Sequence, residues 1–325
     1  MSKENSEIIY HYTSVEGFLN ILRSKTLWVS SLTEMNDSHE GVLHLPALKE
    51  AQQYIPLKVS DIYEKYPESI NECSIEIQEG LDDIHKHIIS QINLVLALSS
   101  SHVSPHICCF SHCKDKLSQW RGYGDDGKGI AIGFNRNKLQ PKQDFHLGQD
   151  VRKSVEEVIY KYDEQVLRCK DFIKDFQNKV LDNTYNLLSI NNSIPLKKEQ
   201  NNQISKYVLE NLSNLPLIFK NESFIEEEEV RLIYQAKNFD SAKYRCVNGN
   251  IISYFEHSFS PDAVEELIIG PKCRLKIDSK DFKNFLSKEY DHLLEEVRDL
   301  TEESRPINTK FSKFEHISFS KSTYR

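Results

Sequence analysis

The sequence lacks several features that would assign it to a class at once. None of its 325 residues forms the apolar segment of a secretory signal, and no apolar run reaches the length that spans a bilayer. We therefore expect a cytoplasmic protein without a membrane partner. The formal net charge of -8 lacks the excess of Lys and Arg with which a protein coats nucleic acid by bulk electrostatics. A local basic groove stays compatible with that balance.

Metal and nucleotide motifs are also missing. The seven cysteines are odd in number and irregular in spacing, which favours a reducing compartment over a disulfide framework. The cluster Cys108, Cys109 and Cys113 has no second C-x-x-C pair, so it indicates buried thiols, and we expect no metal site. The glycine-rich segment 124–129 has neither the G-x-x-x-x-G-K-[ST] nor the G-x-G-x-x-G spacing, which excludes both nucleotide motifs.

What is present is the composition of a globular protein, with 39% hydrophobic and 28% charged residues. Helical periodicity occupies two long ranges, about 48–100 and 152–220, with an Asn-rich break at 183–202. Short β-favouring runs and two further helices occupy the start, middle and end of the chain: strands at 8–14, 26–30, 106–111, 130–134, 263–271 and 317–320, and helices at 16–23 and 278–293. The pattern predicts an α+β fold in one domain, residues 1–325, whose sheet carries two long helical insertions.

Four consecutive glutamates, at positions 226–229, run directly into the β-favouring segment 230–234. In an extended strand, Glu227, Glu229 and Arg231 would share one face. A guanidinium on that face would hold one carboxylate ionised and leave the other to act on a substrate. A solvated acidic run at the start of a strand or helix is the alternative.

Three strand-associated patches are His11-Tyr12-Thr13, Trp120-x-x-Tyr123 and Glu227-x-Glu229-x-Arg231. They occur in one order with L-W-x-S, N-D, C-F-S, I-x-I-G-F and I-I-G-P, over residues 9–40, 109–134 and 227–270. This order resembles a bacterial family filed as a domain of unknown function, which recurs in defence and prophage neighbourhoods. That family is in turn similar to the ADP-ribosyltransferase fold, whose split β core carries His, Tyr and Glu on separate strands.

The resemblance implies NAD as co-substrate and a division of labour around it. His11 would bind the adenosine ribose, Tyr123 would stack on nicotinamide, and Glu229 would bind the 2′-hydroxyl of the nicotinamide ribose. The Glu229 carboxylate would then stabilise the oxocarbenium-like centre that forms as nicotinamide leaves. Glu227 would orient or deprotonate the accepting nucleophile, and Arg231 would hold Glu229 or contact a phosphate.

Other residues are further candidates around the same ligand. Thr13, Ser30 and Asn36 are expected to hydrogen-bond the ribose or pyrophosphate, and Tyr12 is an alternative to His11. Tyr10 is an alternative stacking ring, whereas Trp120 is expected to be structural because paired aromatics at this spacing usually pack a helical turn.

The function implied by the resemblance is an NAD-dependent ADP-ribosyltransferase, a toxin or anti-phage effector that modifies an RNA or DNA base or a host protein. An antitoxin partner is implied as well, and water as the acceptor would make the enzyme an NAD glycohydrolase. A nucleic-acid acceptor would need a basic groove, for which the cations near Tyr123 are candidates: Arg121, Lys128, Arg136, Lys138 and Lys142.

Two other classes stay open. One is a non-catalytic scaffold that binds a nucleotide or a partner through the same fold. The other is a metal-dependent hydrolase built on His11, Asp37, His39 and Glu40 with the late carboxylates, although no H-E-x-x-H spacing supports it.

Overall fold

The computed structural model describes residues 7–32, 44–51, 105–139, 151–191, 215–236, 241–247, 249–295 and 314–324, with isolated positions between 53 and 90. The chain divides into two compact units. The first comprises Met1–Glu34, Ser104–Val158 and Phe224–Arg325, and the second comprises Met35–Val103 and Ile159–Ser223. The second unit takes in most of the two ranges expected to be helical insertions.

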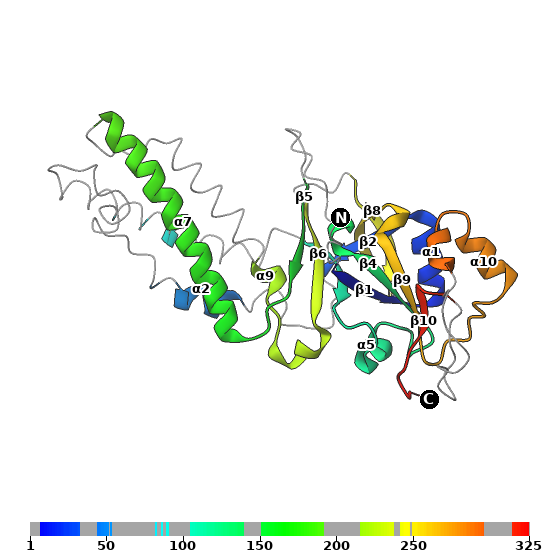
Figure 1. The fold of residues 1–325 in the computed structure, drawn as a ribbon. Helices are drawn as coiled ribbons and strands as arrows, with labels where there is room; N and C mark the ends of the chain where they lie inside the picture. The colour runs from blue at the N-terminus through cyan, green and yellow to red at the C-terminus, as the bar shows by residue number, and fades with distance from the viewer. Residues whose placement is uncertain are drawn as a thin grey trace. The chain divides into compact units, whose positions relative to one another are not determined.

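The first unit is built on a ten-stranded sheet (Figure 1). Its strands are β1 (Ile8–Thr13), β2 (Thr26–Ser31), β3 (His106–Ser111), β4 (Ile130–Asn135), β5 (Val151–Glu157), β6 (Glu229–Ala236), β7 (Lys243–Val247), β8 (Asn250–Ser258), β9 (Val264–Ile269) and β10 (Ile317–Phe319). The order is β10-β9-β4-β1-β3-β2-β8-β7, with β6 on β3 and β5 on β6. The pairs are antiparallel except β10 with β9. This mixture of a sheet and helices confirms the α+β class.

The sheet splits where β1 and β2 meet the same edge of β3. Tyr10 of β1 pairs with Ser111 at one end of β3, whereas Ser30 and Ser31 of β2 pair at the other end. The other edge of β3 pairs with β6 along its whole length. Residues 108–110 of β3 therefore pair, among the strands that the structure describes, with β6 alone, and the sheet opens beside them.

Helices α1 (Val15–Ser24) and α10 (Lys280–Leu286) lie close together on one face of the sheet (Figure 1). Ser14 is the N-cap residue of α1, since its Oγ accepts a hydrogen bond of 3.0 Å from the Gly17 amide. Phe18 and Leu22, one turn apart, are fully buried in the main core between helix and sheet. Burying two such side chains contributes roughly 3 to 6 kcal/mol, which holds α1 beside the split.

The opposite face is covered by α5 (Leu117–Gly122). Trp120 of this helix is fully buried, and its ring lies edge-on to Tyr12 with centroids 4.8 Å apart. The indole nitrogen donates to Asp115 at 2.7 Å, so the polar end of the ring is satisfied. Trp120 is structural, as the sequence predicts.

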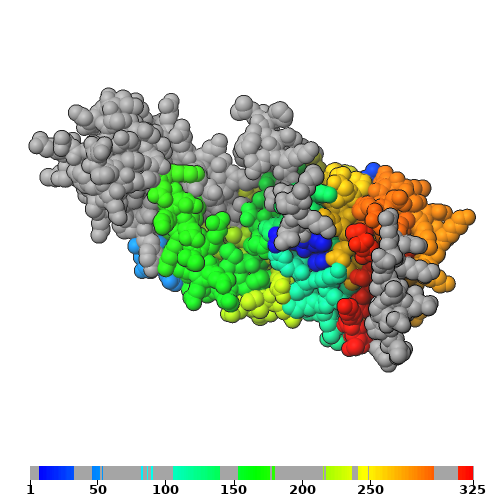
Figure 2. Space-filling view, in the orientation of Figure 1, coloured from blue at the N-terminus to red at the C-terminus, as the bar shows by residue number. Residues whose placement is uncertain are grey.

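A glycine-rich turn leads from α5 into β4, followed by α6 (Arg136–Leu139). Asp125, Asp126 and Gly127 all have positive φ angles, of 49°, 53° and 82°. Tyr324 donates to Asp126 from the C-terminal segment, which Figure 2 shows on the surface beside this region. A Cβ on Gly129 would lie 2.0 Å from the carbonyl oxygen of Thr13, so only glycine fits there.

The second unit contains α2 (His44–Ala51), α7 (Tyr162–Asn191) and α9 (Leu215–Ile218). α2 packs on α7, where the Tyr162 hydroxyl donates to Glu50 at 2.9 Å. The buried residues of α7 follow a helical stripe: Val166, Cys169, Phe172 and Ile173. The side-chain amide of Gln165 donates to carbonyl oxygens of Ile159, Tyr160 and Lys220, which ties the start of α7 to the segment after α9.

Two local expectations are wrong. Residues 151–157 form β5 and not a helix, because they pair with β6 along their full length. α7 extends to Asn191, inside the range 183–202 where a break is expected, and the rest of that range lies outside the described residues. Glu227 does not belong to a strand: it ends the 3₁₀ helix η3 (Glu222–Glu227), and Glu228 has a φ of 44°. The shared strand face predicted for Glu227, Glu229 and Arg231 therefore reduces to Glu229 and Arg231.

Candidate functional site

A cavity of about 770 Å³ lies at the split and is called the split pocket below. It is lined by residues of α1, β1, β2, β3, β7 and β8: His11, Thr13, Gly17, Asn20, Ile21, Arg23, Ser24, Thr26, Trp28, Ser30, Ile107, Cys108, Cys109, Arg245 and Glu256. All of these residues belong to the first unit. Three of the predicted ligand-binding residues, His11, Thr13 and Ser30, thus line one cavity.

His11 presents an acceptor to this pocket. Its Nδ1 lies 2.9 Å from the carbonyl oxygen of Cys109, on the stretch of β3 next to the split. A carbonyl oxygen only accepts, so Nδ1 carries the ring proton. Burial lowers the pKa of His11 below its usual 6.5. The ring is therefore neutral at pH 7, and Nε2 keeps a lone pair that accepts from a hydroxyl.

Tyr12 lies on the other face of the sheet from His11, because neighbouring residues of a strand point to opposite faces. Its hydroxyl donates to the carbonyl oxygen of Cys113 at 2.6 Å, and its ring packs on Trp120. Burial raises the pKa of Tyr12. The structure gives Tyr12 a place in the core under α5, away from the split pocket.

Glu229 and Arg231 form a bidentate ion pair on that second face. Arg231 Nε lies 2.8 Å from Glu229 Oε1, and Nη2 lies 3.0 Å from Oε2. Glu229 is 4% exposed and Arg231 is fully buried. In the pairing of β3 with β6, Ser111 lies opposite Glu229 and Cys109 lies opposite Arg231. Cys109 therefore lies between the ion pair and the split. Burial and the nearby Glu229 carboxylate raise the pKa of the Cys109 thiol.

The register separates His11 from Glu229. Tyr10 pairs with Ser111, and Ser111 pairs with Glu229, so these three side chains share one face. His11, one residue after Tyr10, points to the other face, where its ring lies 5.7 Å from that of Phe110. The expectation that His11 and Glu229 face one cavity is therefore not met by the split pocket, which Glu229 does not line.

Tyr123 and Glu227 do meet. The Tyr123 hydroxyl donates to Glu227 Oε1 at 3.0 Å, which joins the end of α5 to the end of η3. Tyr123 is 39% exposed. Ser111 fixes the Glu227 backbone, because its Oγ donates to the Glu227 carbonyl oxygen at 2.6 Å. Two of the predicted catalytic residues thus lie together, although not on the split pocket. Asn36 lies outside the described residues, as do Asp37, His39 and Glu40.

The sequence alone did not identify Arg245 and Trp28 as pocket residues. The Arg245 guanidinium donates to Ser30 Oγ at 3.0 Å and lies 5.3 Å from the Trp28 ring centroid. Trp28 alternates with the buried Leu27 and Val29, a pattern that signals an outward ring. Arg245 reaches the pocket only through the pairing of β7, β8 and β2, for which the local sequence holds no signal.

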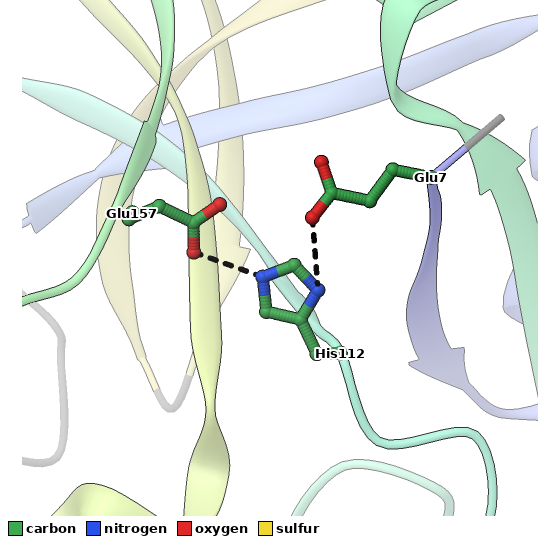
Figure 3. Close-up of side chains that lie close together, drawn as sticks. All are labelled: Glu7, His112 and Glu157. Carbon is green, nitrogen blue, oxygen red and sulfur yellow. Dashed lines mark hydrogen bonds and ion pairs between the residues drawn. The ribbon is translucent and has the colours of Figure 1, made fainter. Parts of the chain in front are cut away.

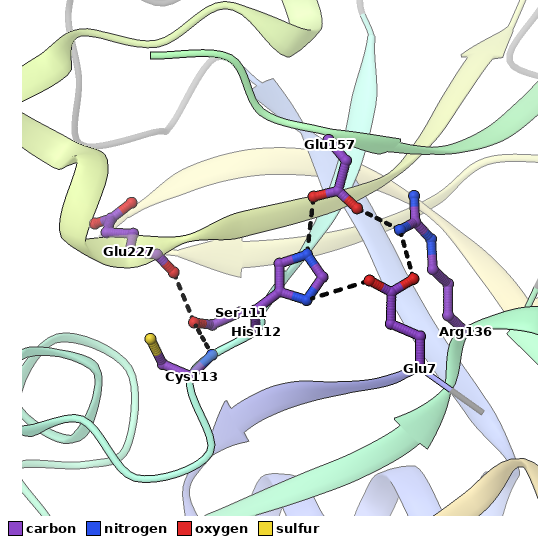
Figure 4. Close-up of polar contacts among 7 residues, drawn as sticks. All are labelled: Glu7, Ser111, His112, Cys113, Arg136, Glu157 and Glu227. Carbon is purple, nitrogen blue, oxygen red and sulfur yellow. Dashed lines mark hydrogen bonds and ion pairs between the residues drawn. The ribbon is translucent and has the colours of Figure 1, made fainter. Parts of the chain in front are cut away.

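A second group of titratable residues joins four segments at one end of the sheet. Figure 3 shows the His112 ring between two carboxylates, with Nε2 2.9 Å from Glu157 and Nδ1 3.7 Å from Glu7. Figure 4 shows Arg136 bonded to the same two carboxylates. The hydrogen bond to Glu157 raises the pKa of His112.

Glu7, His112 and Glu157 are close enough together to hold a metal ion. The Arg136 guanidinium already compensates both carboxylates, and a bound cation would be repelled by it. The group is therefore better described as an ion-pair network that holds the strand ends together. Among the described residues, Glu295, Glu315 and His316 form a second group whose side chains are close enough together to hold a metal ion.

Comparisons with known proteins give one match. A family model described as "Protein of unknown function (DUF2971)" matches residues 119–232, roughly a third of the chain. The matched range contains Tyr123, Glu227, Glu229 and Arg231 but not His11. No curated protein and no solved structure matches the chain. Among the helices described, none combines the length and apolar character needed to cross a bilayer. The chain is thus similar, over this range, to a family whose function is not assigned.

Proposed function

We propose that this chain binds NAD in the split pocket and transfers its ADP-ribose to an acceptor. The observation that carries the proposal is the polar set on one cavity: the neutral His11 ring, the hydroxyls of Thr13 and Ser30, and the guanidinium of Arg245. A volume of about 770 Å³ suits a small-molecule ligand. We choose NAD as the ligand because the order of the motifs resembles that of the ADP-ribosyltransferase fold.

In this proposal His11 Nε2 accepts a hydrogen bond from a ribose hydroxyl, while Thr13 and Ser30 contact the sugar–phosphate part. The bond between C1′ of the ribose and the nicotinamide nitrogen breaks, and nicotinamide leaves as a neutral molecule with the bonding electron pair. The acceptor nucleophile attacks C1′ and loses its proton. A carboxylate beside C1′ stabilises the positive charge that develops there.

Glu229 and Glu227 are the carboxylates proposed for these steps. Glu229 lies behind Cys109, which lines the split pocket, so a ligand that reaches past Cys109 meets the Glu229–Arg231 pair. Glu227, partly exposed and held by Tyr123, is the proposed base for the acceptor. We propose an RNA or DNA base or a protein side chain as the acceptor, and an antitoxin as the partner that keeps the enzyme inactive.

The test is to incubate purified protein with NAD labelled in the ADP-ribose part and with separate pools of RNA, DNA and cell lysate. Free nicotinamide is measured by chromatography. Glu229→Gln is expected to lose label transfer, whereas Glu228→Gln, the same change at the exposed neighbouring position, is expected to keep it. Label in one pool identifies the acceptor class. Nicotinamide release without label transfer identifies a glycohydrolase, and the absence of nicotinamide in every reaction contradicts enzymatic activity.

A second candidate function is nucleotide binding without catalysis. It is favoured by the burial of Glu229 and by the engagement of both of its oxygens with Arg231. A carboxylate held in this way is already satisfied and is shielded from a substrate. This function predicts saturable NAD binding and no nicotinamide release over hours, in the wild type and in Glu229→Gln alike.

A further inference from the structure

The guanidinium of Arg245 has a buried hydrogen-bond donor without an acceptor. Its Nη2 donates to Ser30 Oγ at 3.0 Å, but its Nε is buried without a hydrogen-bond partner. No carboxylate of the described residues forms an ion pair with it. The acidic residue on the same pocket, Glu256, is engaged by Lys243 at 2.8 Å. A buried guanidinium nitrogen without an acceptor costs stability, which a bound anion would offset.

The surroundings of Arg245 fix the direction of its guanidinium. The group lies over the Trp28 ring, with Cζ 5.3 Å from the ring centroid, and Trp28 packs in turn on Tyr254 with centroids 4.5 Å apart. Pairing of β2 with β8 and of β8 with β7 places these residues on one surface of the sheet. A guanidinium held between the Trp28 ring and Ser30 Oγ has less freedom to lose on binding, and its donor fork matches two oxygens of a phosphate.

The charge of the pocket favours an anion. Arg23, at the end of α1, is a second cation that lines the pocket, and Lys243 compensates the lining carboxylate of Glu256. His11 of β1 is uncharged and offers an acceptor. One cavity thus holds an acceptor suited to a sugar hydroxyl and a cationic group suited to an oxyanion.

We infer that Arg245 is the phosphate-binding residue of the split pocket and that its ligand is a phosphate ester with a sugar hydroxyl within reach of His11. This inference rests on the proposed function in naming NAD as the physiological ligand. It concerns a residue outside the range matched by the family model. The role assigned to Arg245 is to bind the pyrophosphate, with Ser30 orienting its guanidinium.

The test is calorimetric titration of the full chain with ADP, inorganic pyrophosphate, adenosine and NAD. We expect Arg245→Gln to weaken ADP and pyrophosphate binding at least about tenfold, equivalent to about 1.4 kcal/mol, and to leave adenosine binding unchanged. Arg274→Gln is the matched control, because it removes the same charge from an exposed position outside the split pocket. It is expected to stay within about twofold of the wild type.

A second variant keeps the test decisive if Arg245→Gln does not fold, as judged by circular dichroism. Arg245→Lys retains the charge but loses the donor fork of the guanidinium, so we expect a several-fold weakening of ADP binding. Equal losses in Arg245 and Arg274 variants, or no loss in either, overturn the inference. Binding of ADP and pyrophosphate but not NAD, with the Arg245 dependence intact, supports the inference and contradicts NAD as the substrate. NAD binding that Arg245→Gln does not weaken supports NAD as the substrate and contradicts the role of Arg245. A wild type that binds none of the ligands contradicts both the inference and the proposed function.

Discussion

The split pocket and the Glu229–Arg231 pair lie on either side of the same strand, β3, and they use polar residues in opposite ways. The pair is nearly closed to solvent, and each carboxylate oxygen meets a guanidinium nitrogen at 2.8 or 3.0 Å. The pocket is open, and Arg245 has a buried donor without an acceptor. A buried pair whose charged atoms are hydrogen-bonded to each other is already compensated within the fold, whereas a buried donor without an acceptor on a cavity is prepared for a ligand.

This difference changes the weight given to the glutamate motif. E-x-E-x-R contains the residue types of a catalytic site, but the side chain with solvent access is Glu227, at the end of a 3₁₀ helix. The ligand-binding features concentrate at the split, which the sequence marks only through His11, Thr13 and Ser30. The following variants test whether the two regions differ as described.

The largest expected effect is on the stability of the buried pair. Arg231→Met leaves the Glu229 carboxylate buried without its cation, and we expect the free energy of unfolding to fall by about 3 to 5 kcal/mol. Arg274→Met, at an exposed position, should change it by less than about 0.5 kcal/mol. Urea unfolding followed by circular dichroism measures both. A loss below about 1 kcal/mol for Arg231→Met would mean that the burial of the Glu229 carboxylate does not depend on Arg231.

The next effect separates binding from stability at the split pocket. His11→Asn removes the Nε2 acceptor, and we expect NAD affinity to fall about tenfold, the value of one hydrogen bond of about 1.4 kcal/mol. His292→Asn is the matched control, since the His292 ring also bonds a backbone carbonyl, that of Val264 at 2.7 Å, outside the pocket. Titration calorimetry compares the two variants. Equal NAD affinities of the two variants would mean that His11 is a structural residue of the core and does not contact the ligand.

A smaller effect concerns pH. The pKa of His112 is raised by its hydrogen bond to Glu157, within a network that also contains Glu7 and Arg136. A raised folded-state pKa contributes stability that is fully present below the unfolded pKa, about 6.5, and is lost as pH rises through the folded value. The network is partly exposed, so we expect under about 1 kcal/mol.

The measurement is the unfolding free energy of the wild type and of His112→Gln between about pH 6 and about pH 8.5. The wild type should lose its advantage over the variant as the pH rises. A difference between the two proteins that stays constant over this range, or that grows with pH, is incompatible with the raised pKa.

The smallest effect is expected where Tyr123 meets Glu227. Tyr123→Phe keeps the ring and removes the exposed hydrogen bond of 3.0 Å, so stability should change by less than about 1 kcal/mol. Thermal unfolding checks this. In the label-transfer assay the same variant reports on catalysis. A large loss of transfer at unchanged stability means that Tyr123 and Glu227 act in the acceptor step. Unchanged transfer means that their hydrogen bond has no part in catalysis.

Strand positions were the most predictable part of the fold. Alternating β-favouring runs gave β1, β2, β3, β4, β9 and β10 close to their observed bounds, because each has strong local signals. The strand β5 was missed because its sequence, Val-Arg-Lys-Ser-Val-Glu-Glu, is charged and leads directly towards α7. Its pairing with β6 overrides that local preference.

The site was predictable only in its residue types. Three pocket residues, His11, Thr13 and Ser30, were identified from motifs, but the faces of the strands depend on register. One left-handed residue, Glu228, takes Glu227 out of the strand that the sequence favours. Arg245 enters the pocket through pairing of segments more than 200 positions apart, from Ser30 to Arg245, which no local pattern encodes.

Photoaffinity labelling with an azido derivative of NAD tests the central claim most directly. The account predicts saturable labelling, competed by excess NAD, on peptides from β2 or β7 that contain Trp28 or Arg245. Labelling confined to the α5 and η3 segments around Tyr123 and Glu227, or labelling that excess NAD does not reduce, would contradict the split pocket as the nucleotide site.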